Sequence, residues 1–267
     1  MMKNFALALM FLSPLVLAET KNVSGYKIDT SSLCNGFPKV NVKTQEGTCM
    51  GLVASEADGL KRPRRILSLG NNEFIVTEMA GWVANAGKVF LLDAAKNKLT
   101  VIFDKVDHAH GLALGPDGLV YIGTRSSIFR FDPRDPKNTK ESVIENLPAE
   151  GSHPLTHFIF DQAGNLIINI GAPSDQCLDK SDKPQYPCPQ SEGENPGTAL
   201  RLYSRNSDGT YTKFKVIAKG LRNSMALAIE PNSNQLLQGE NSMDFSDAAT
   251  PLEEINLSMY VFQHTCP

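Results

Sequence analysis

Short apolar segments, each followed by a polar turn and a second apolar segment, recur along the chain. The four units are residues 66–76, 112–122, 158–168 and 227–237. Their turns are built from Gly, Pro, Asp and Asn, which supply the backbone angles of a tight hairpin. Each unit is therefore predicted to be a β-hairpin.

The spacing of the hairpins indicates the fold class. Their first residues, 66, 112, 158 and 227, are 46, 46 and 69 residues apart. Further apolar runs fill the intervals and predict four strands per unit, at 88–92, 99–103, 127–131, 199–203 and 214–218. A period in the forties with several strands per unit is typical of propeller blades. We therefore expect an all-β protein, a β-propeller of four-stranded blades; a β-sandwich would also have short strands but not this repeat.

Two segments fall outside the repeat. The longer third interval contains a polar insertion, residues 172–197, rich in Pro, Ser, Asp and Gly. The N-terminus has the form of a signal peptide, with Lys3, an apolar run over 5–17 and small residues up to Ala18. We expect cleavage after Ala18 and a periplasmic or secreted protein with no membrane span; a retained amphipathic N-terminus is the alternative.

Charge gives little indication of a charged partner. The 26 basic and 29 acidic residues give a net charge of −3, without long blocks of either sign. Residues 61–65, Lys-Arg-Pro-Arg-Arg, form the one basic cluster in the sequence, which we interpret as a solvated loop. No nucleic-acid partner is expected.

The five cysteines fit an exported protein. Cys34 and Cys49, and Cys177 and Cys188, are close enough in sequence to form two disulfides that each close a short loop. Metal binding is the rival interpretation, although no CxxC motif occurs. Cys266 is left without a partner near the end of the chain.

Four motifs occur in order in the second half of the chain. They are His153 before the hairpin that ends in Asn169-Ile-Gly171, then Gly220-Leu-Arg222-Asn223, then the strand and acidic loop of residues 236–244, and then Glu253-Glu-Ile-Asn256. In this order they resemble the soluble quinoprotein glucose/sorbosone dehydrogenase family. Members of that family are six-bladed propellers that use pyrroloquinoline quinone (PQQ) and calcium.

The resemblance implies a role for each motif. His153 would be the general base that takes a hydroxyl proton from an aldose or sorbosone-like sugar. Arg222 would stabilise the negative charge that develops on the quinone, and Asn223 would hydrogen-bond the cofactor. Electrons would then pass to an external acceptor.

The resemblance also implies a calcium site in the loop after the acidic strand. The family binds the ion through backbone carbonyls of a Gly-Pro pair, and Ser242 and Met243 stand at these positions. Glu253 would bind a second calcium ion or cap a turn. His108 and His110 have a spacing that suits metal ligands or two histidines at a strand edge.

The chain departs from the family at its end. Four hairpins are two short of six blades, and residues 258–267 form an atypical tail without a repeat. We therefore expect an incomplete propeller over residues 19–257, from a truncated or frame-shifted gene. Two alternatives to the dehydrogenase stay open, namely an inactive or non-catalytic propeller that binds carbohydrate or protein, and a calcium-dependent lactonase.

Overall fold

The computed structural model describes residues 20–23, 25–178, 181, 183, 185–241 and 254–258. The chain divides into two compact units, residues 1–59 and 60–267. The expected signal peptide, Ser242, Met243, Glu253 and Cys266 lie outside the described residues. No described helix is long and apolar enough to cross a membrane.

The first unit is a small disulfide-linked sheet. Its antiparallel strands are β1 (Thr20–Val23), β2 (Tyr26–Cys34) and β3 (Phe37–Val40), followed by the 3-10 helix Glu56–Asp58. The Cys34–Cys49 disulfide ties the end of β2 to the segment after β3, which confirms the expected pairing. These strands were not predicted, and the sheet is separate from the blades, which begin at Pro63.

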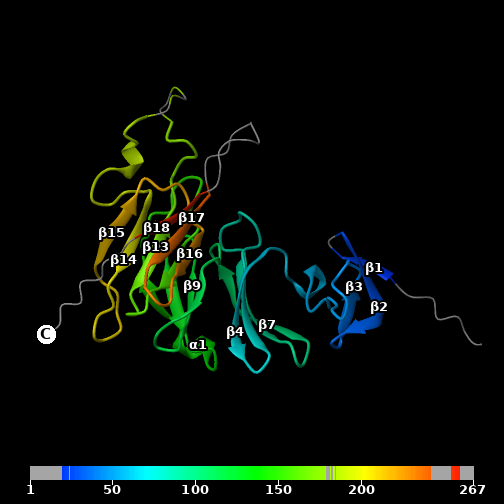
Figure 1. Cartoon of the computed structure of the whole chain (residues 1–267). Coiled ribbons are helices and arrows are strands. Elements are labelled where there is room, and N and C mark those ends of the chain that lie inside the picture. The colour runs from blue at the N-terminus through cyan, green and yellow to red at the C-terminus, as the bar shows by residue number, and fades with distance from the viewer. Residues whose placement is uncertain are drawn as a thin grey trace, which may run out of the picture. The chain divides into compact units, whose positions relative to one another are not determined.

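The second unit contains four antiparallel sheets in the described residues, each built in chain order as a propeller blade (Figure 1). Blade 1 consists of β4 (Pro63–Gly70), β5 (Glu73–Glu78), β6 (Gly87–Asp93) and β7 (Lys98–Val106). Blade 2 consists of β8 (Leu112–Leu114), β9 (Val120–Gly123), β10 (Ile128–Phe131) and β11 (Glu141–Ile144), and the short helix α1 (Pro136–Thr139) precedes β11. Blade 3 consists of β12 (His157–Phe160), β13 (Leu166–Ile170), β14 (Ala199–Tyr203) and β15 (Phe214–Lys219), and the 3-10 helix Pro189–Ser191 lies in its polar insertion. Blade 4 consists of β16 (Ala226–Ile229), β17 (Leu236–Glu240) and β18 (Glu254–Ser258). The expected all-β propeller fold is confirmed.

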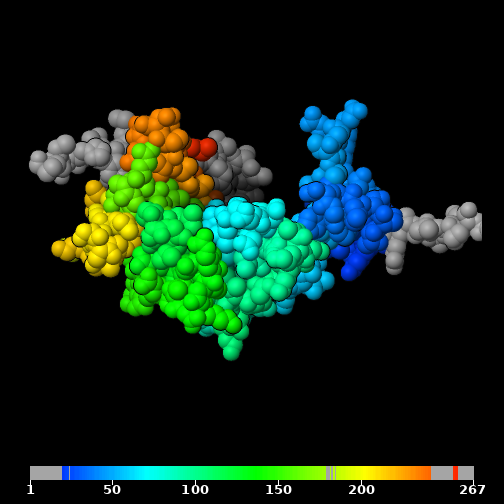
Figure 2. All heavy atoms as spheres, turned by 90° about the horizontal axis from the view of Figure 1, so that it is seen from below, coloured from blue at the N-terminus to red at the C-terminus, as the bar shows by residue number. Residues whose placement is uncertain are grey.

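The strand register agrees with the sequence repeat. In three hairpins, the first residue of the repeat pairs with the last: Ile66 with Val76, Leu112 with Ile122 and Phe158 with Ile168. In the fourth hairpin the pairing is shifted by one residue, and Leu227 pairs with Gln238. Many apolar residues of these hairpins, such as Ile75, Ile122 and Ile168, pack in the core between blades, whereas Ile66 is exposed. Figure 2 shows the blades following one another through cyan, green, yellow and orange.

The core consists of layers between successive blades. Blades 1 and 2 enclose a layer that includes Ile75, Val89 and Phe131, blades 2 and 3 one that includes Tyr121, Phe158 and Ile168, and blades 3 and 4 one that includes Leu200 and Leu236. The innermost strands β4, β8, β12 and β16 contact one another in this order. The unit is thus built around neighbouring inner strands.

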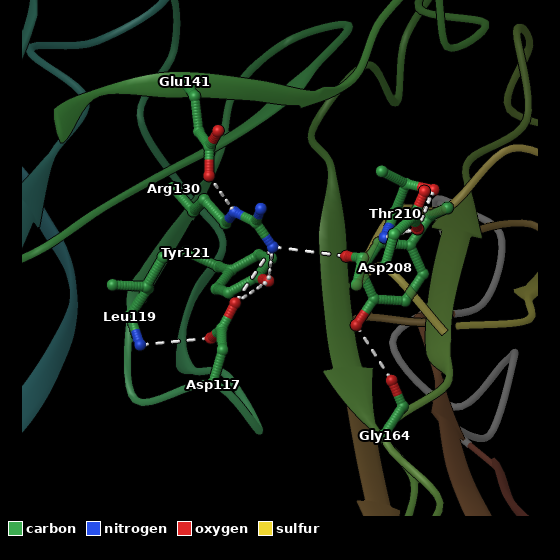
Figure 3. A network of polar contacts seen from close by, with 10 residues as sticks. Asp117, Leu119, Tyr121, Arg130, Glu141, Gly164, Asp208 and Thr210 are labelled. Carbon is green, nitrogen blue, oxygen red and sulfur yellow. Dashed lines mark hydrogen bonds and ion pairs between the residues drawn. The ribbon is translucent and has the colours of Figure 1, made fainter. Parts of the chain in front are cut away.

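A polar network also joins blades 2 and 3 (Figure 3). Arg130 Nη1 donates to Asp117 Oδ2 and to Tyr121 Oη, each at 2.9 Å, and to the Gly209 carbonyl at 3.3 Å. Arg130 Nε donates to Glu141. Because Gly209 belongs to the β14–β15 hairpin, this largely buried guanidinium links the two blades.

Candidate functional site

The inner strands of all four blades begin at the same end of the unit. Arg65 lies near the start of β4, and its Nη2 is 3.1 Å from Nδ1 of His157, the first residue of β12. The same Nη2 donates to the carbonyl of Met225, just before β16, at 3.2 Å. The His157 ring lies 6.2 Å from the ring of His110, just before β8. The loops that precede the inner strands therefore converge here, and this end is called the upper face below.

His153 lies on the upper face, in the connection before β12. Its Nδ1 lies 2.6 Å from the Ala172 carbonyl oxygen. A carbonyl oxygen can only accept, so Nδ1 carries the hydrogen and a neutral imidazole keeps its lone pair on Nε2. Gly171 allows this approach, since a Cβ there would meet the His153 carbonyl at 2.4 Å. In the neutral ring, Nε2 of His153 is thus the nitrogen that can accept a hydrogen bond.

Arg222 is joined to His153 through the same residue. Ala172, whose carbonyl accepts from His153, donates its N–H to the Arg222 carbonyl at 2.7 Å. The Arg222 side chain pairs with Asp175, to which Nε donates at 2.7 Å, and Nη1 donates to the Asn241 carbonyl at 3.0 Å. Asp175 belongs to the polar insertion after β13, and nothing in its sequence context indicated this contact.

The turn that carries Arg222 and Asn223 is fixed by a carboxylate. Glu240, at the end of β17, accepts from the backbone N–H of Arg222 and, at 2.9 Å, from that of Asn223. Its second oxygen accepts from Ser224 Oγ at 3.1 Å and from Gln238 Nε2 at 2.5 Å. Charged acceptors make stronger hydrogen bonds than neutral ones, so Glu240 restrains the whole turn.

Asn169 fixes the same turn from blade 3. Its Nδ2 donates to Asn223 Oδ1 at 3.2 Å, and its Oδ1 accepts from the Ser224 N–H at 3.0 Å. Asn169 is the first residue of the Asn-Ile-Gly segment that ends β13. The motifs at 153, 169–171 and 220–223 therefore meet in one place, where Glu240 fixes the turn of the last motif.

Arg65, His110 and His157 form a second group, which the sequence interpretation missed. The expectation of a solvated loop at residues 61–65 is wrong for Arg65, because β4 starts at Pro63 and Arg65 packs against His157. Both histidines are almost completely buried. Burial, together with the positive charge of Arg65 and, for His110, that of Arg64, lowers the pKa of both histidines to about 3. His110 Nδ1 is buried and has no hydrogen-bond partner among the described residues.

His108 does not join this group. It lies in the connection before β8, with φ of 48°, rather than on a strand edge. Its Nδ1 lies 2.6 Å from Asp107 Oδ1, and its ring lies 5.9 Å from the Trp82 ring. The described residues contain no group of three or more His, Cys, Asp or Glu side chains that could hold a metal ion. The implied calcium residues Ser242, Met243 and Glu253 lie outside this part of the chain.

A cleft of about 610 Å³ lies beside His153 on the upper face. Blade 2 contributes Arg125, Asn146 and Glu150 to its lining, and blade 3 contributes Gly171. Gly171 also touches His153, so the wall of the cleft lies against the candidate base. Its size falls in the range of ligand pockets, about 300–1,000 Å³.

Comparison with known proteins agrees with the fold. A family model described as TrAA12-like matches residues 42–256. A structure of the Trichoderma reesei Carbohydrate-Active Enzymes Family AA12 protein superposes with a TM-score of 0.54 at 21% identity, covering 75% of this chain and 52% of that one. The holo form of the pyranose dehydrogenase PQQ domain from Coprinopsis cinerea gives 0.52 at 16% identity, covering 74% and 48%.

Regucalcin, a calcium-binding protein from Agrobacterium tumefaciens, is also similar, with a TM-score of 0.50 at 14% identity, covering 86% of this chain and 68% of that one. At these identities the structures show the fold alone. The chain spans about half the length of the AA12 protein and of the PQQ domain. No curated protein sequence matches the chain.

Proposed function

Since the chain belongs to the TrAA12-like family, we propose that it functions as a PQQ-dependent carbohydrate oxidoreductase, with calcium as a second cofactor. The observation that carries this proposal is the junction at Ala172, which joins a base with a defined free nitrogen, His153, to a fixed cation, Arg222. Oxidising a sugar hydroxyl requires a group that takes its proton and an acceptor for the hydride. His153 provides the first of these, and bound PQQ supplies the second.

The residues on the upper face suit PQQ, which carries three carboxylates. Arg65 and Arg222 supply positive charge from blades 1 and 4, and Asn223 supplies an amide on the same turn as Arg222. The unpaired, buried Nδ1 of His110 offers a further polar atom beside Arg65 and His157. These are the residues that we expect to hold the cofactor.

The chain's own residues would act on the sugar as follows. A hydroxyl next to His153 would donate its hydrogen to Nε2, while the Nδ1 hydrogen bond to Ala172 keeps the ring in place. The imidazolium that forms is stabilised because Nδ1–H still donates to the carbonyl. Arg222, held in place by Asp175 and by the Asn241 carbonyl, would stabilise the negative charge that develops on bound PQQ during the reaction.

The test is reconstitution with PQQ and Ca²⁺, followed by dye reduction across a panel of aldoses and sorbosone. His153→Gln should lower turnover by about 10²–10⁴-fold, the usual contribution of a general base, and leave PQQ affinity within a few fold. Glu145→Gln, at an exposed site on blade 2, is the matched control and should leave both unchanged. Full turnover by His153→Gln would exclude the base role.

The same reconstitution, with PQQ binding and lactone hydrolysis measured beside dye reduction, separates the alternatives. A protein that does not bind PQQ contradicts the proposal. PQQ binding without turnover favours the non-catalytic propeller, and hydrolysis of a sugar lactone with Ca²⁺ alone favours the lactonase. We also propose export from the cytoplasm and transfer of electrons to an external acceptor, in keeping with the two disulfides.

A further inference from the structure

The single tryptophan of the chain stands exposed on the upper face. Trp82 lies in the loop between β5 and β6, and 60% of its surface is accessible. Tryptophan is a large, rigid, mostly apolar side chain, and exposing it gives up the stabilisation that burial would supply. Trp82 and its exposed neighbour Val83 together give this loop a small apolar surface next to the candidate site, which is available to a ligand.

The loop holds Trp82 in a defined position. At its start, Glu78 Oε1 accepts from the N–H groups of Ala80 at 2.6 Å and Arg62 at 3.1 Å, and the Met79 side chain is buried. At its end, the Asn85 N–H donates to Asp107 Oδ1 at 3.3 Å. The Trp82 side chain is thus presented to solvent from a loop whose two ends are tied to the blade.

Trp82 is connected to the cleft and to His153 by successive contacts. Its ring lies 5.9 Å from that of His108, which is bonded to Asp107. The Asp107 carbonyl accepts from the N–H of Arg125 at 3.0 Å, and Arg125 lines the cleft. Gly171 on the opposite wall touches His153. The exposed indole and the cleft therefore lie on the same face, and this series of contacts links both to the candidate base.

The chemistry of this surface fits a chain of sugar units. The cleft presents a guanidinium, an amide and a carboxylate, from Arg125, Asn146 and Glu150, which can bond to hydroxyl groups. Arg125 Nη2 already donates to the Ala149 carbonyl at 3.0 Å, so its position is fixed. The flat indole offers a negative π-face to the polarised C–H groups on one side of a sugar ring. One hexose is much smaller than the drug-sized ligands that such clefts enclose.

We propose that Trp82 and the cleft form one extended carbohydrate-binding surface, which holds sugar units beyond the one at His153. The preferred ligand is then an oligosaccharide or the end of a polysaccharide rather than a free monosaccharide. The inference rests on the proposed function only for the unit that lies at His153. The binding of the other units does not require PQQ.

Because Trp82 is the only tryptophan, the fluorescence of the PQQ-free protein reports on this position alone. We would titrate it with β-1,4-linked oligomers of glucose, mannose, xylose and N-acetylglucosamine, each beside its monomer. At least one oligomer should give a saturable change at concentrations where its monomer gives none. The absence of a response to every oligomer would overturn the inference.

Variants provide an independent measure. Trp82→Ala should weaken oligomer binding about fivefold by calorimetry, the contribution of one aromatic contact, while Trp82→Phe should retain most of it. Val83→Ala, at the equally exposed neighbour in the same loop, is the matched control and should bind normally. In the reconstituted protein, Trp82→Ala should raise KM for the oligomer and leave kcat unchanged. Equal losses for oligomer and monomer would overturn the inference, whereas oligomer binding without sugar oxidation would contradict only the proposed function.

Discussion

Acid should destabilise the propeller unit through its two buried imidazoles. Burial, with a contribution from the neighbouring guanidinium of Arg65, lowers the pKa of His110 and His157 to about 3. In the unfolded chain the pKa of histidine is about 6.5. Between these values the unfolded chain takes up two protons that the folded protein does not bind.

The sign and size of the effect follow from this difference. The unfolded state binds more protons below about pH 6.5, so the free energy of unfolding decreases as the pH falls from there toward 3. Each histidine contributes about 1.4 kcal/mol per pH unit in this window. Acidification from about pH 6.5 to about pH 5 should therefore cost about 2 kcal/mol for each imidazole and about 4 kcal/mol for the pair.

Urea denaturation followed by circular dichroism at about pH 7 and about pH 5 measures the loss. His110→Gln removes one of the two groups, so the difference between the two pH values should shrink by about 2 kcal/mol relative to the unsubstituted protein. Carboxylates that also titrate in this range are the same in both proteins and cancel from the comparison. An unchanged pH dependence in His110→Gln would refute the argument that burial keeps this ring neutral.

Two further substitutions test the contacts that hold the site and the blades. Glu240→Gln replaces one carboxylate oxygen by an N–H₂ group, which faces N–H and O–H donors of the turn 222–224. The substitution should lower the free energy of unfolding by about 2–3 kcal/mol. An unfolding temperature equal to that of Glu145→Gln would contradict this expectation. Arg130→Met removes the hydrogen bond to the Gly209 carbonyl and the ion pairs to nearby carboxylates. Thermal denaturation should therefore show a decrease of about 1–3 kcal/mol in the free energy of unfolding. An unchanged melting temperature would show that apolar packing alone joins blades 2 and 3.

The blades could be predicted because their information is local. Each hairpin has its apolar run, its turn and its second run within eleven residues. The first and last residues of the unit pair in three of the hairpins, and the pairing is shifted by one residue in the fourth. The expected strands at 88–92, 99–103, 127–131, 199–203 and 214–218 are confirmed, as are both disulfides. Strands such as β11, whose residues 141–144 include two polar side chains, have too short an apolar pattern to be found in this way.

The site was predicted in part. His153, Arg222 and Asn223 were found through a resemblance in motif order, and their proximity depends on Asn169 and Gly171 in the same motifs. Their roles stay predictions, as do the calcium ligands. Asp175 was missed because it lies in a polar insertion, where a carboxylate that pairs with Arg222 has the same local context as a solvated one.

Arg65 shows most directly why the remaining contacts could not be found. In the sequence it belongs to a basic cluster, and such clusters are usually solvated. In the structure its guanidinium lies beside His157, 92 residues later, and donates to the Met225 carbonyl, 160 residues later. Only the side-by-side packing of inner strands brings these positions together. The repeat predicts that the strands exist, whereas the packing of the strands decides which ionisable side chains are buried. Burial lowers the pKa of His157, so the upper face has a neutral histidine beside the guanidinium of Arg65.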